Sequence, residues 1–236
     1  MKTLITGSTG FLGSAVLREL LDDGREVKVL VRKGTRTANI DGLDVEIAYG
    51  DLRDLESIRS ALTGCDILYH VAAYYSLWDR DQQLIYEINV EGTRKILQAA
   101  KEKGLEKIVY TSTVGCIGLN EDTTPATENT FFNKNTLSND YKKSKYQAEQ
   151  VALEFARGGL PVVIVNPSTP VGPRDIKPTP TGKIILDFLN REMPAYLDTG
   201  LNLIDVKDCA RGHILAEQKG VPGERYILGN QNMSLL

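Results

Sequence analysis

The stretch Thr6-Gly7-Ser8-Thr9-Gly10-Phe11-Leu12-Gly13 decides the fold class of this chain. It follows Lys2–Thr6, an apolar run with the length and composition of a buried strand. It opens Phe11–Asp23, where apolar residues recur every three or four positions, as in an amphipathic helix. The three glycines allow a tight turn, a close approach of the backbone to a pyrophosphate, and close packing of the helix on the strand. The stretch therefore predicts a dinucleotide-binding site, with the first helix amides facing the anion.

Short β-rich runs and longer helical patterns alternate through the first two thirds of the chain. After Lys2–Thr6, the predicted strands are Val27–Val31, Val45–Ala48, Ile67–Val71, Ile108–Thr111 and Val162–Val165. After Phe11–Asp23, the predicted helices are Leu55–Leu62, Leu84–Lys103 and Lys142–Arg157. This alternation predicts right-handed βαβ crossovers and hence an α/β fold, a Rossmann-type doubly wound parallel sheet with helices on both faces.

The sequence pattern changes after Asn166. Five of the nine prolines lie between residues 167 and 180, and we expect no regular element in so proline-rich a segment. We therefore predict a dinucleotide-binding domain over residues 1–166 and a small substrate-binding part over residues 167–236, interleaved with the last elements of the sheet. In that part, Gly182–Asn190 and Val206–Lys219 are predicted helices and Arg225–Leu228 is a predicted last strand.

The composition of the chain limits the kinds of molecule that it can bind. The chain has 236 residues and a formal net charge of −3, so it lacks the positive field that a nucleic-acid-binding protein needs. Its three cysteines, Cys65, Cys116 and Cys209, have neither a disulfide nor a zinc spacing, which favours a reducing cytoplasm and predicts no metal site. No apolar stretch reaches the roughly 18 residues of a membrane span. We expect a soluble cytoplasmic protein that acts on a small molecule.

The end of the second predicted strand bears on the choice of cofactor. Dinucleotide folds that bind NAD place an acidic residue there, on the adenosine 2′-hydroxyl. This chain has Arg32 and Lys33 instead, and their cations would pair with the 2′-phosphate of NADP. The pattern favours NADP over NAD; the alternative interpretation is that Arg32 and Lys33 are simply solvated loop charges.

A candidate catalytic pair lies on a predicted helix. Tyr141 and Lys145 are four residues apart, so both side chains project from one helix face, and a neighbouring ammonium would lower the pKa of the phenol. Such a pair can act as an acid and base. Upstream, the hydroxyls of Thr111, Ser112 and Thr113 end a predicted strand, where an open α/β sheet has its ligand crevice.

Eight stretches of the chain together carry a family resemblance: Thr6–Gly13, Gly50–Leu52, His70–Ala73, Asn89–Thr93, Thr111–Gly118, Tyr141–Lys145, Asn166–Pro167 and Asn202–Ala210. Through them the chain resembles the extended short-chain dehydrogenase/reductases, also called the NAD-dependent epimerase/dehydratase family. Within that family it is most similar to the dihydroflavonol-reductase-like branch and to bacterial proteins labelled hopanoid-associated sugar epimerases. The resemblance covers nearly the whole chain.

The resemblance implies roles for individual residues. Tyr141 and Lys145 would be the catalytic pair, and Lys145 would also hold the nicotinamide ribose. The catalytic hydroxyl would be that of Thr113, although Ser112 is adjacent; adjacent strand residues point to opposite faces. Tyr74, Thr113 and Asn166 would contact the substrate. The remaining implied cofactor contacts are Gly7, Thr9, Gly10, Phe11, Leu12, Arg32, Lys33, Asp51 and Leu52 beside the adenine, Ala72 and Ala73 beside the ribose, Thr111, Pro167, Ser168 and Thr169.

The implied activity is hydride transfer between a nicotinamide and a carbon that bears a hydroxyl or carbonyl group. Either a net reductase or a nucleotide-sugar epimerase that retains its cofactor would use the same residues, and a cofactor-sensing protein without activity is a remote third possibility. The resemblance also implies a homodimer formed through Leu84–Lys103 and Lys142–Arg157. Because family members continue past the residues at which this sequence ends, we expect its substrate part to be truncated.

Several other residues admit two interpretations. His70 fits a hydrogen-bonded core position better than an acid or base, and Cys116, with no basic partner in view, fits packing. Asn89 within a helix is either a polar group near the site or a satisfied buried amide. The aromatic residues Tyr74, Tyr75 and Trp78 either contact the substrate or cover the core.

Overall fold

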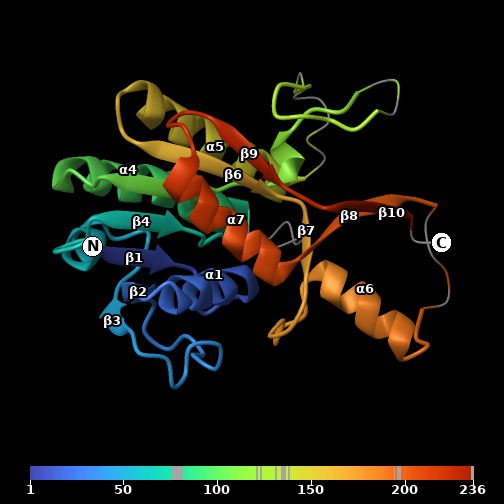
Figure 1. Cartoon of the computed structure of the whole chain (residues 1–236), viewed down its shortest axis with the longest axis horizontal. Helices are drawn as coiled ribbons and strands as arrows, with labels where there is room; N and C mark the ends of the chain where they lie inside the picture. Colours follow the sequence, from blue (N-terminus) through green and yellow to red (C-terminus); the bar gives the residue numbers. More distant parts are fainter. Residues whose placement is uncertain are drawn as a thin grey trace.

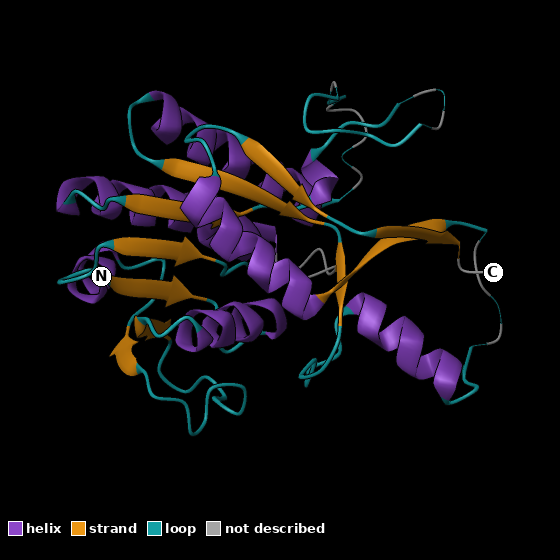
Figure 2. Ribbon diagram, viewed as in Figure 1, coloured by secondary structure: helices purple, strands orange, loops and turns teal. Residues whose placement is uncertain are grey.

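The computed structural model describes residues 1–75, 82–120, 122, 124–130, 132–133, 137, 139–193, 195 and 198–234. Its centre is a seven-stranded sheet in the order β3-β2-β1-β4-β5-β6-β9, in which every neighbouring pair is parallel (Figures 1 and 2). The strands are β1 (Lys2–Thr6), β2 (Glu26–Val31), β3 (Glu46–Tyr49), β4 (Ile67–His70), β5 (Lys107–Thr111), β6 (Val162–Pro167) and β9 (Arg225–Leu228). The predicted doubly wound fold is confirmed.

Helices cover both faces of this sheet. The first face carries α2 (Leu55–Ala61), α4 (Gly92–Lys103) and α5 (Asp140–Arg157), whose apolar residues form one core with Leu68 and Ile108. The second face carries α1 (Phe11–Asp22) and α7 (Val206–Lys219), which bury Leu17 and Ile214 against Val29 and Val109. Because both faces are covered, the strands read as continuous apolar runs, which is why they were visible in the sequence.

The predicted helix Leu84–Lys103 is interrupted. It consists of α3 (Gln82–Tyr86), a π-helical turn η2 (Glu87–Glu91) and α4, joined end to end. A π turn adds one residue per turn and shifts the side chains that follow it, and such turns are frequent at functional sites. This turn contains the buried Asn89.

The proline-rich segment is more regular than predicted. A short strand, β7 (Thr169–Val171), runs through Pro170, and helix α6 (Pro180–Leu189) has Pro180 at its first turn. The expectation of no regular element is therefore wrong. Proline is tolerated in β7 because this strand pairs on one side only, and at the start of α6 because that amide needs no helical partner.

A second sheet lies beyond the carboxyl ends of the main strands. It has three strands in the order β10-β8-β7, formed with β8 (Gly200–Asp205) and β10 (Gln231–Ser234), neither of which was predicted (Figure 1). Helix α7 and strand β9 nevertheless pack in and on the main sheet. The division at residue 166 remains a prediction.

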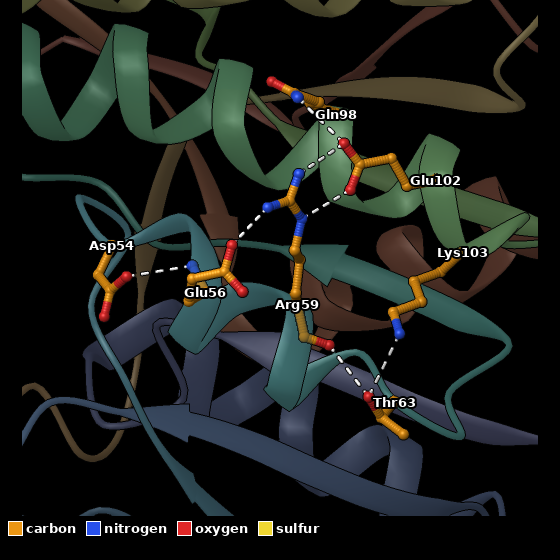
Figure 3. A network of polar contacts seen from close by, with 7 residues as sticks. All are labelled: Asp54, Glu56, Arg59, Thr63, Gln98, Glu102 and Lys103. Carbon is orange, nitrogen blue, oxygen red and sulfur yellow. Dashed lines mark hydrogen bonds and ion pairs between the residues drawn. The ribbon is translucent and has the colours of Figure 1, made fainter.

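An exposed ionic network joins α2 to α4 on the molecular surface. Arg59 donates to both carboxylate oxygens of Glu102, at 2.7 and 2.9 Å, and also contacts Glu56 (Figure 3). Asp54 caps α2 by accepting a hydrogen bond from the Glu56 amide. Ion pairs of this exposed kind contribute little to stability, so the packing of the apolar faces fixes the helices.

Among the described residues, no helix combines the length and apolar character that crossing a bilayer requires. Nor do the described histidine, cysteine and acidic side chains gather in groups of three or more that would hold a metal ion.

Candidate active site

A cleft of about 1090 Å³ runs along the carboxyl edge of the main sheet. The structure brings nearly all the predicted site residues to its wall. The exceptions are Lys33, which is exposed away from it, and Asn166, which is buried beneath it. The predicted residues on the wall are Gly7, Thr9, Gly10, Phe11, Leu12, Arg32, Asp51, Leu52, Ala72, Ala73, Tyr74, Thr111, Thr113, Tyr141, Lys145, Pro167, Ser168 and Thr169.

The turn between β1 and α1 can be built only from glycine at two positions. Gly7 has a φ of +78°, and a Cβ there would lie 2.7 Å from the Ala72 nitrogen. A Cβ on Gly13 would lie 2.1 Å from the Gly7 carbonyl oxygen. The turn therefore brings the start of α1 directly against β1 and the end of β4, leaving room for a ligand in front of it.

The amino end of α1 is suited to a pyrophosphate. Gly10 is its N-cap and supplies no side-chain cap, and no acidic residue occupies the first turn. The backbone amides at a helix start attract anions because the helix dipole is positive there. Asn39 closes this end by donating from Nδ2 to the Thr9 carbonyl oxygen at 3.2 Å. The residues present thus fit a dinucleotide.

The far end of the cleft has two exposed arginines, Arg32 and Arg36. Asp51, on the same wall, is already paired, since Arg53 donates to its carboxylate oxygens at 3.0 and 2.8 Å. This pairing holds the pKa of Asp51 below its usual value. The arginines therefore face the cleft with their nearest acid neutralised by another cation.

Lys145 lies buried at the opposite end. Its Nζ donates to the Thr111 carbonyl oxygen at 2.8 Å and to the Tyr110 hydroxyl at 3.3 Å. Burial lowers the pKa of Lys145 to about 8, although Cys116 and Glu149 act in the opposite direction. The ammonium group therefore titrates well below the usual pH range of a lysine.

Tyr141 does not have the lowered pKa expected from its lysine neighbour. Burial raises the pKa of Tyr141 above its usual value, with smaller contributions from Cys116 and Tyr75. The Tyr75 ring packs edge-on against it, with 4.6 Å between ring centroids. The direction predicted for this pKa is thus wrong in this structure, because burial of the phenol dominates and Lys145 donates its hydrogen bonds to Thr111 and Tyr110. Tyr141 stands in the cleft as a protonated phenol.

The two candidate hydroxyls after β5 have different surroundings. Ser112 is buried and donates to the Glu149 carboxylate. Thr113 is half-buried on the cleft wall, and its Oγ1 accepts a hydrogen bond from the Gly115 amide at 3.2 Å. Since that bond uses the oxygen of Thr113, its hydroxyl hydrogen remains to be donated to a ligand.

Asn166 and Asn89 form hydrogen bonds with the backbone of residues that line the cleft. The Asn166 Nδ2 donates to the Thr113 carbonyl oxygen at 2.9 Å, so the predicted substrate residue supports the wall instead of forming it. Asn89 accepts from the Tyr74 amide at 2.7 Å and donates to the Tyr74 carbonyl oxygen at 2.9 Å. Its Nδ2 also donates to Ser144 on α5 at 3.0 Å. Asn89 is therefore a satisfied buried amide, and it also ties the backbone of Tyr74 to α5 beside the site.

Two further predictions concern buried groups. His70 lies between Thr6 and Thr93, at 2.8 and 3.1 Å, and burial lowers its pKa to about 3, as in a neutral core histidine. Burial raises the pKa of Cys116 to about 12, so it is a thiol used in packing. Tyr74 and Tyr75 line the cleft. Trp78 lies outside the described residues.

Sequence reasoning missed part of the cleft. Arg36 and Asn39 follow Arg32 on the nucleotide side, and the cluster of basic residues at 32, 33 and 36 was the available signal for Arg36. Ile176 and the start of α6 also line the cleft, and the carbonyl oxygen of the preceding Arg174 accepts a hydrogen bond from Asn39 at 3.4 Å. Nothing in the spacing of those residues pointed to the site, since their position depends on the second sheet.

The fold and the cleft define a nicotinamide-dependent oxidoreductase of the Rossmann type. The chain belongs to the NAD dependent epimerase/dehydratase family, whose model matches residues 3–229. It is 51% identical over 235 residues to a protein of Synechocystis named putative dihydroflavonol 4-reductase, covering 98% of this chain and 68% of that protein.

Two solved structures are also similar to this chain. The crystal structure of gox2253 has 51% identity and a TM-score of 0.95, covering 99% of this chain and 71% of that one. The Thermus thermophilus UDP-glucose 4-epimerase, solved in complex with NAD, has 26% identity and a TM-score of 0.86, covering 99% of this chain and 79% of that one. These findings confirm the family resemblance and support a nicotinamide cofactor for this cleft.

Proposed function

We propose that this protein is an NADP-dependent reductase that converts a carbonyl group of an apolar, aromatic substrate into an alcohol. The observation that carries the proposal is the union, in one cleft, of the Tyr141 phenol, the Thr113 hydroxyl and the glycine-built anion site. The nicotinamide, when bound, supplies the hydride. The glycine turn and the start of α1 would hold its diphosphate, and Ser168, whose buried Oγ has no partner among the described residues, would face its other end.

The chain's own residues handle the proton. The raised pKa of Tyr141 keeps its phenol protonated, so it can give a proton to the oxygen as negative charge develops there. The Thr113 hydroxyl would donate a hydrogen bond to the same oxygen and stabilise that charge. The Lys145 ammonium, with a pKa of about 8, would supply positive charge beside both groups below that pH.

The preference for NADP rests on Arg32 and Arg36. Two guanidinium groups on the adenosine side can form charge-assisted hydrogen bonds with a 2′-phosphate. Asp51 does not oppose them, because Arg53 pairs with it.

The substrate class rests on the walls near Tyr141. Tyr75 packs against Tyr141, and Tyr74 lines the same cleft, so the site offers aromatic surface there, which suits an aromatic molecule such as a dihydroflavonol. This agrees with the name of the Synechocystis relative. The similarity to a UDP-glucose 4-epimerase favours a second candidate, epimerisation of a nucleotide sugar with retained cofactor.

Net cofactor consumption separates the two candidates. With NADPH and a dihydroflavonol, we expect loss of absorbance at the reduced-nicotinamide band and formation of one alcohol per NADPH oxidised. With UDP-glucose, we expect no conversion by proton NMR. Formation of UDP-galactose without net oxidation, with oxidised nucleotide found in the denatured protein by mass spectrometry, would replace the reductase with the epimerase.

We also propose a homodimer and a cytoplasmic location. Helices α4 and α5 pack side by side, as the expected dimer surface requires, and Arg94 on α4 pairs with Glu154 on α5. Cys65, Cys116 and Cys209 are free and buried, which suits a reducing compartment. Light scattering of the purified protein tests the dimer, and a monomeric mass would contradict it.

A further inference from the structure

Glu149 is a charged side chain with no exposed surface, on the catalytic face of α5. It follows Lys145 by four residues, as Lys145 follows Tyr141, so the three side chains project from one face of the helix. Burying a carboxylate is costly unless hydrogen bonds and a counter-charge compensate it. The partners of Glu149 that supply these hydrogen bonds and this counter-charge therefore indicate its role.

Three strands of the main sheet supply those partners. The Glu149 Oε2 accepts hydrogen bonds from the Ser112 hydroxyl, just after β5, and from the Asn166 Nδ2 in β6, at 2.8 Å for the latter. The guanidinium of Arg225 in β9 lies 3.4 Å from Oε1 and supplies the counter-charge. One carboxylate thus ties α5 to the ends of three neighbouring strands.

The network continues to the wall of the cleft. The same Nδ2 of Asn166 donates to the Thr113 carbonyl oxygen at 2.9 Å. Ser112, bonded to Glu149, is the residue directly before Thr113 in the chain. Glu149 therefore fixes the backbone of Thr113 from two sides, through Ser112 and through Asn166.

Arg225 is itself held from outside the sheet. It donates to the Glu128 carbonyl oxygen, and the Glu128 carboxylate accepts from the Ile227 amide at 2.9 Å. These contacts orient the guanidinium toward Glu149, so the carboxylate keeps its position relative to both α5 and the strands.

We propose that Glu149 is a positioning residue for the reaction: its carboxylate, bound to Ser112, Asn166 and Arg225, places the Thr113 hydroxyl opposite Tyr141. The inference rests on the proposed function, in which Thr113 binds the substrate oxygen. It adds Glu149 and Arg225, which do not line the cleft, to the residues that determine turnover.

Glu149→Gln tests the proposal, because it keeps the side-chain volume and removes the charge. With NADPH and a dihydroflavonol, we expect kcat to fall about 10- to 100-fold, since a small misplacement of a catalytic group has effects of this order. The KM for NADPH should stay within about twofold, because the anion site is not touched. The matched control is Glu154→Gln, which removes an exposed carboxylate from the same helix and should leave both constants unchanged.

Arg225 gives an independent variant in case Glu149→Gln does not fold. Arg225→Lys keeps the counter-charge and should retain most of kcat, whereas Arg225→Met should lose it as Glu149→Gln does. Equal kcat for Glu149→Gln and Glu154→Gln, with an active wild type, would overturn the positioning role.

Failure of the proposed function has a different signature. In that case the wild type would be as inactive as Tyr141→Phe, and the position of Thr113 would be measured directly through its methyl NMR signal. A shift of that signal in Glu149→Gln but not in Glu154→Gln supports the positioning role. An unshifted signal in both overturns it.

Discussion

The nucleotide half and the catalytic half of the cleft are built in different ways. The anion site of the nucleotide half is made of backbone: Gly7 and Gly13 bring the start of α1 against the sheet, and its amides face the ligand. The catalytic half is made of side chains, and Tyr141, Lys145 and Thr113 take their places through partners on other segments of the chain. The anion site is a local structure of one turn, whereas the catalytic half depends on contacts across the sheet.

This difference predicts that the two halves can be damaged separately, and the largest effect should come from the catalytic half. Tyr141→Phe removes the proton donor and keeps the ring that packs against Tyr75. Turnover of a dihydroflavonol should fall by about 10²- to 10⁴-fold, the usual contribution of general acid catalysis. Steady-state kinetics measure the loss.

Binding of the cofactor is the control for that variant. Titration of Tyr141→Phe with NADPH, followed by fluorescence, should give the wild-type dissociation constant. A variant that lost binding and turnover together would show that the two halves are not separable.

Damage to the nucleotide half should have the converse effect. In Gly13→Ala the new methyl group would meet the Gly7 carbonyl oxygen at 2.1 Å, so the start of α1 must move. Overpacking of this kind costs about 1–3 kcal/mol, and we expect NADPH binding to weaken by roughly 10- to 100-fold. Isothermal titration calorimetry measures the change.

Gly158→Ala is the matched control for that substitution. Gly158 ends α5 with a φ of −77° and has its nearest contact for a Cβ at 3.3 Å, away from the cleft. It should bind NADPH like the wild type. Equal binding by both alanine variants would mean that the close approach at Gly13 does not shape the anion site.

A smaller effect concerns the choice between the two nicotinamide cofactors. Arg36→Ala should weaken NADPH binding on the order of tenfold, the loss of one charge-assisted hydrogen bond, with NADH binding unchanged. Lys33→Ala is the control, because Lys33 lies off the cleft wall. The ratio of kcat/KM for the two cofactors is the measurement, and an unchanged ratio in Arg36→Ala would remove the basis for NADP.

The smallest expected effect is a decline in activity as the pH rises. Because burial lowers the pKa of Lys145 to about 8, its ammonium form is lost as the pH rises through about 8, well below the usual value of 10.5. We expect kcat/KM, which reports the free enzyme, to decline with a midpoint near pH 8. Tyr141 should add nothing in this range, since its pKa is raised.

Lys145→Arg separates this explanation from others. A guanidinium stays charged across the range, so the decline near pH 8 should disappear, whatever the residual activity. A decline that persists in Lys145→Arg would assign it to another group.

The difference between local and long-range contacts also explains how much of the fold and of the site could be predicted from the sequence. The glycine turn could be predicted because its requirements lie within eight residues, and the strands because both faces of the sheet are buried. The Tyr141–Lys145 spacing was equally local, but its electrostatics were not. Burial within the folded chain raises the pKa of Tyr141, and Lys145 donates its hydrogen bonds to Tyr110 and Thr111, more than thirty residues away.

Long-range partners account for the other differences. Asn166 was expected at the substrate, yet its amide is used by Glu149 and the Thr113 carbonyl. Strand β8 pairs with β7 and β10, and these pairings place Pro170 in a strand that its own local sequence disfavours. No spacing within one element encodes such contacts, so they become visible only in the folded chain.

The most direct test of hydride transfer in this cleft uses NADPH labelled with deuterium at C4 of the nicotinamide. When each of the two C4 positions is labelled in turn, the protein should transfer one deuterium from one of them to the carbon of a dihydroflavonol that becomes the alcohol. Mass spectrometry and NMR of the product detect it. An alcohol without deuterium from either labelled cofactor, or a labelled alcohol formed equally well by Tyr141→Phe, would contradict the assignment.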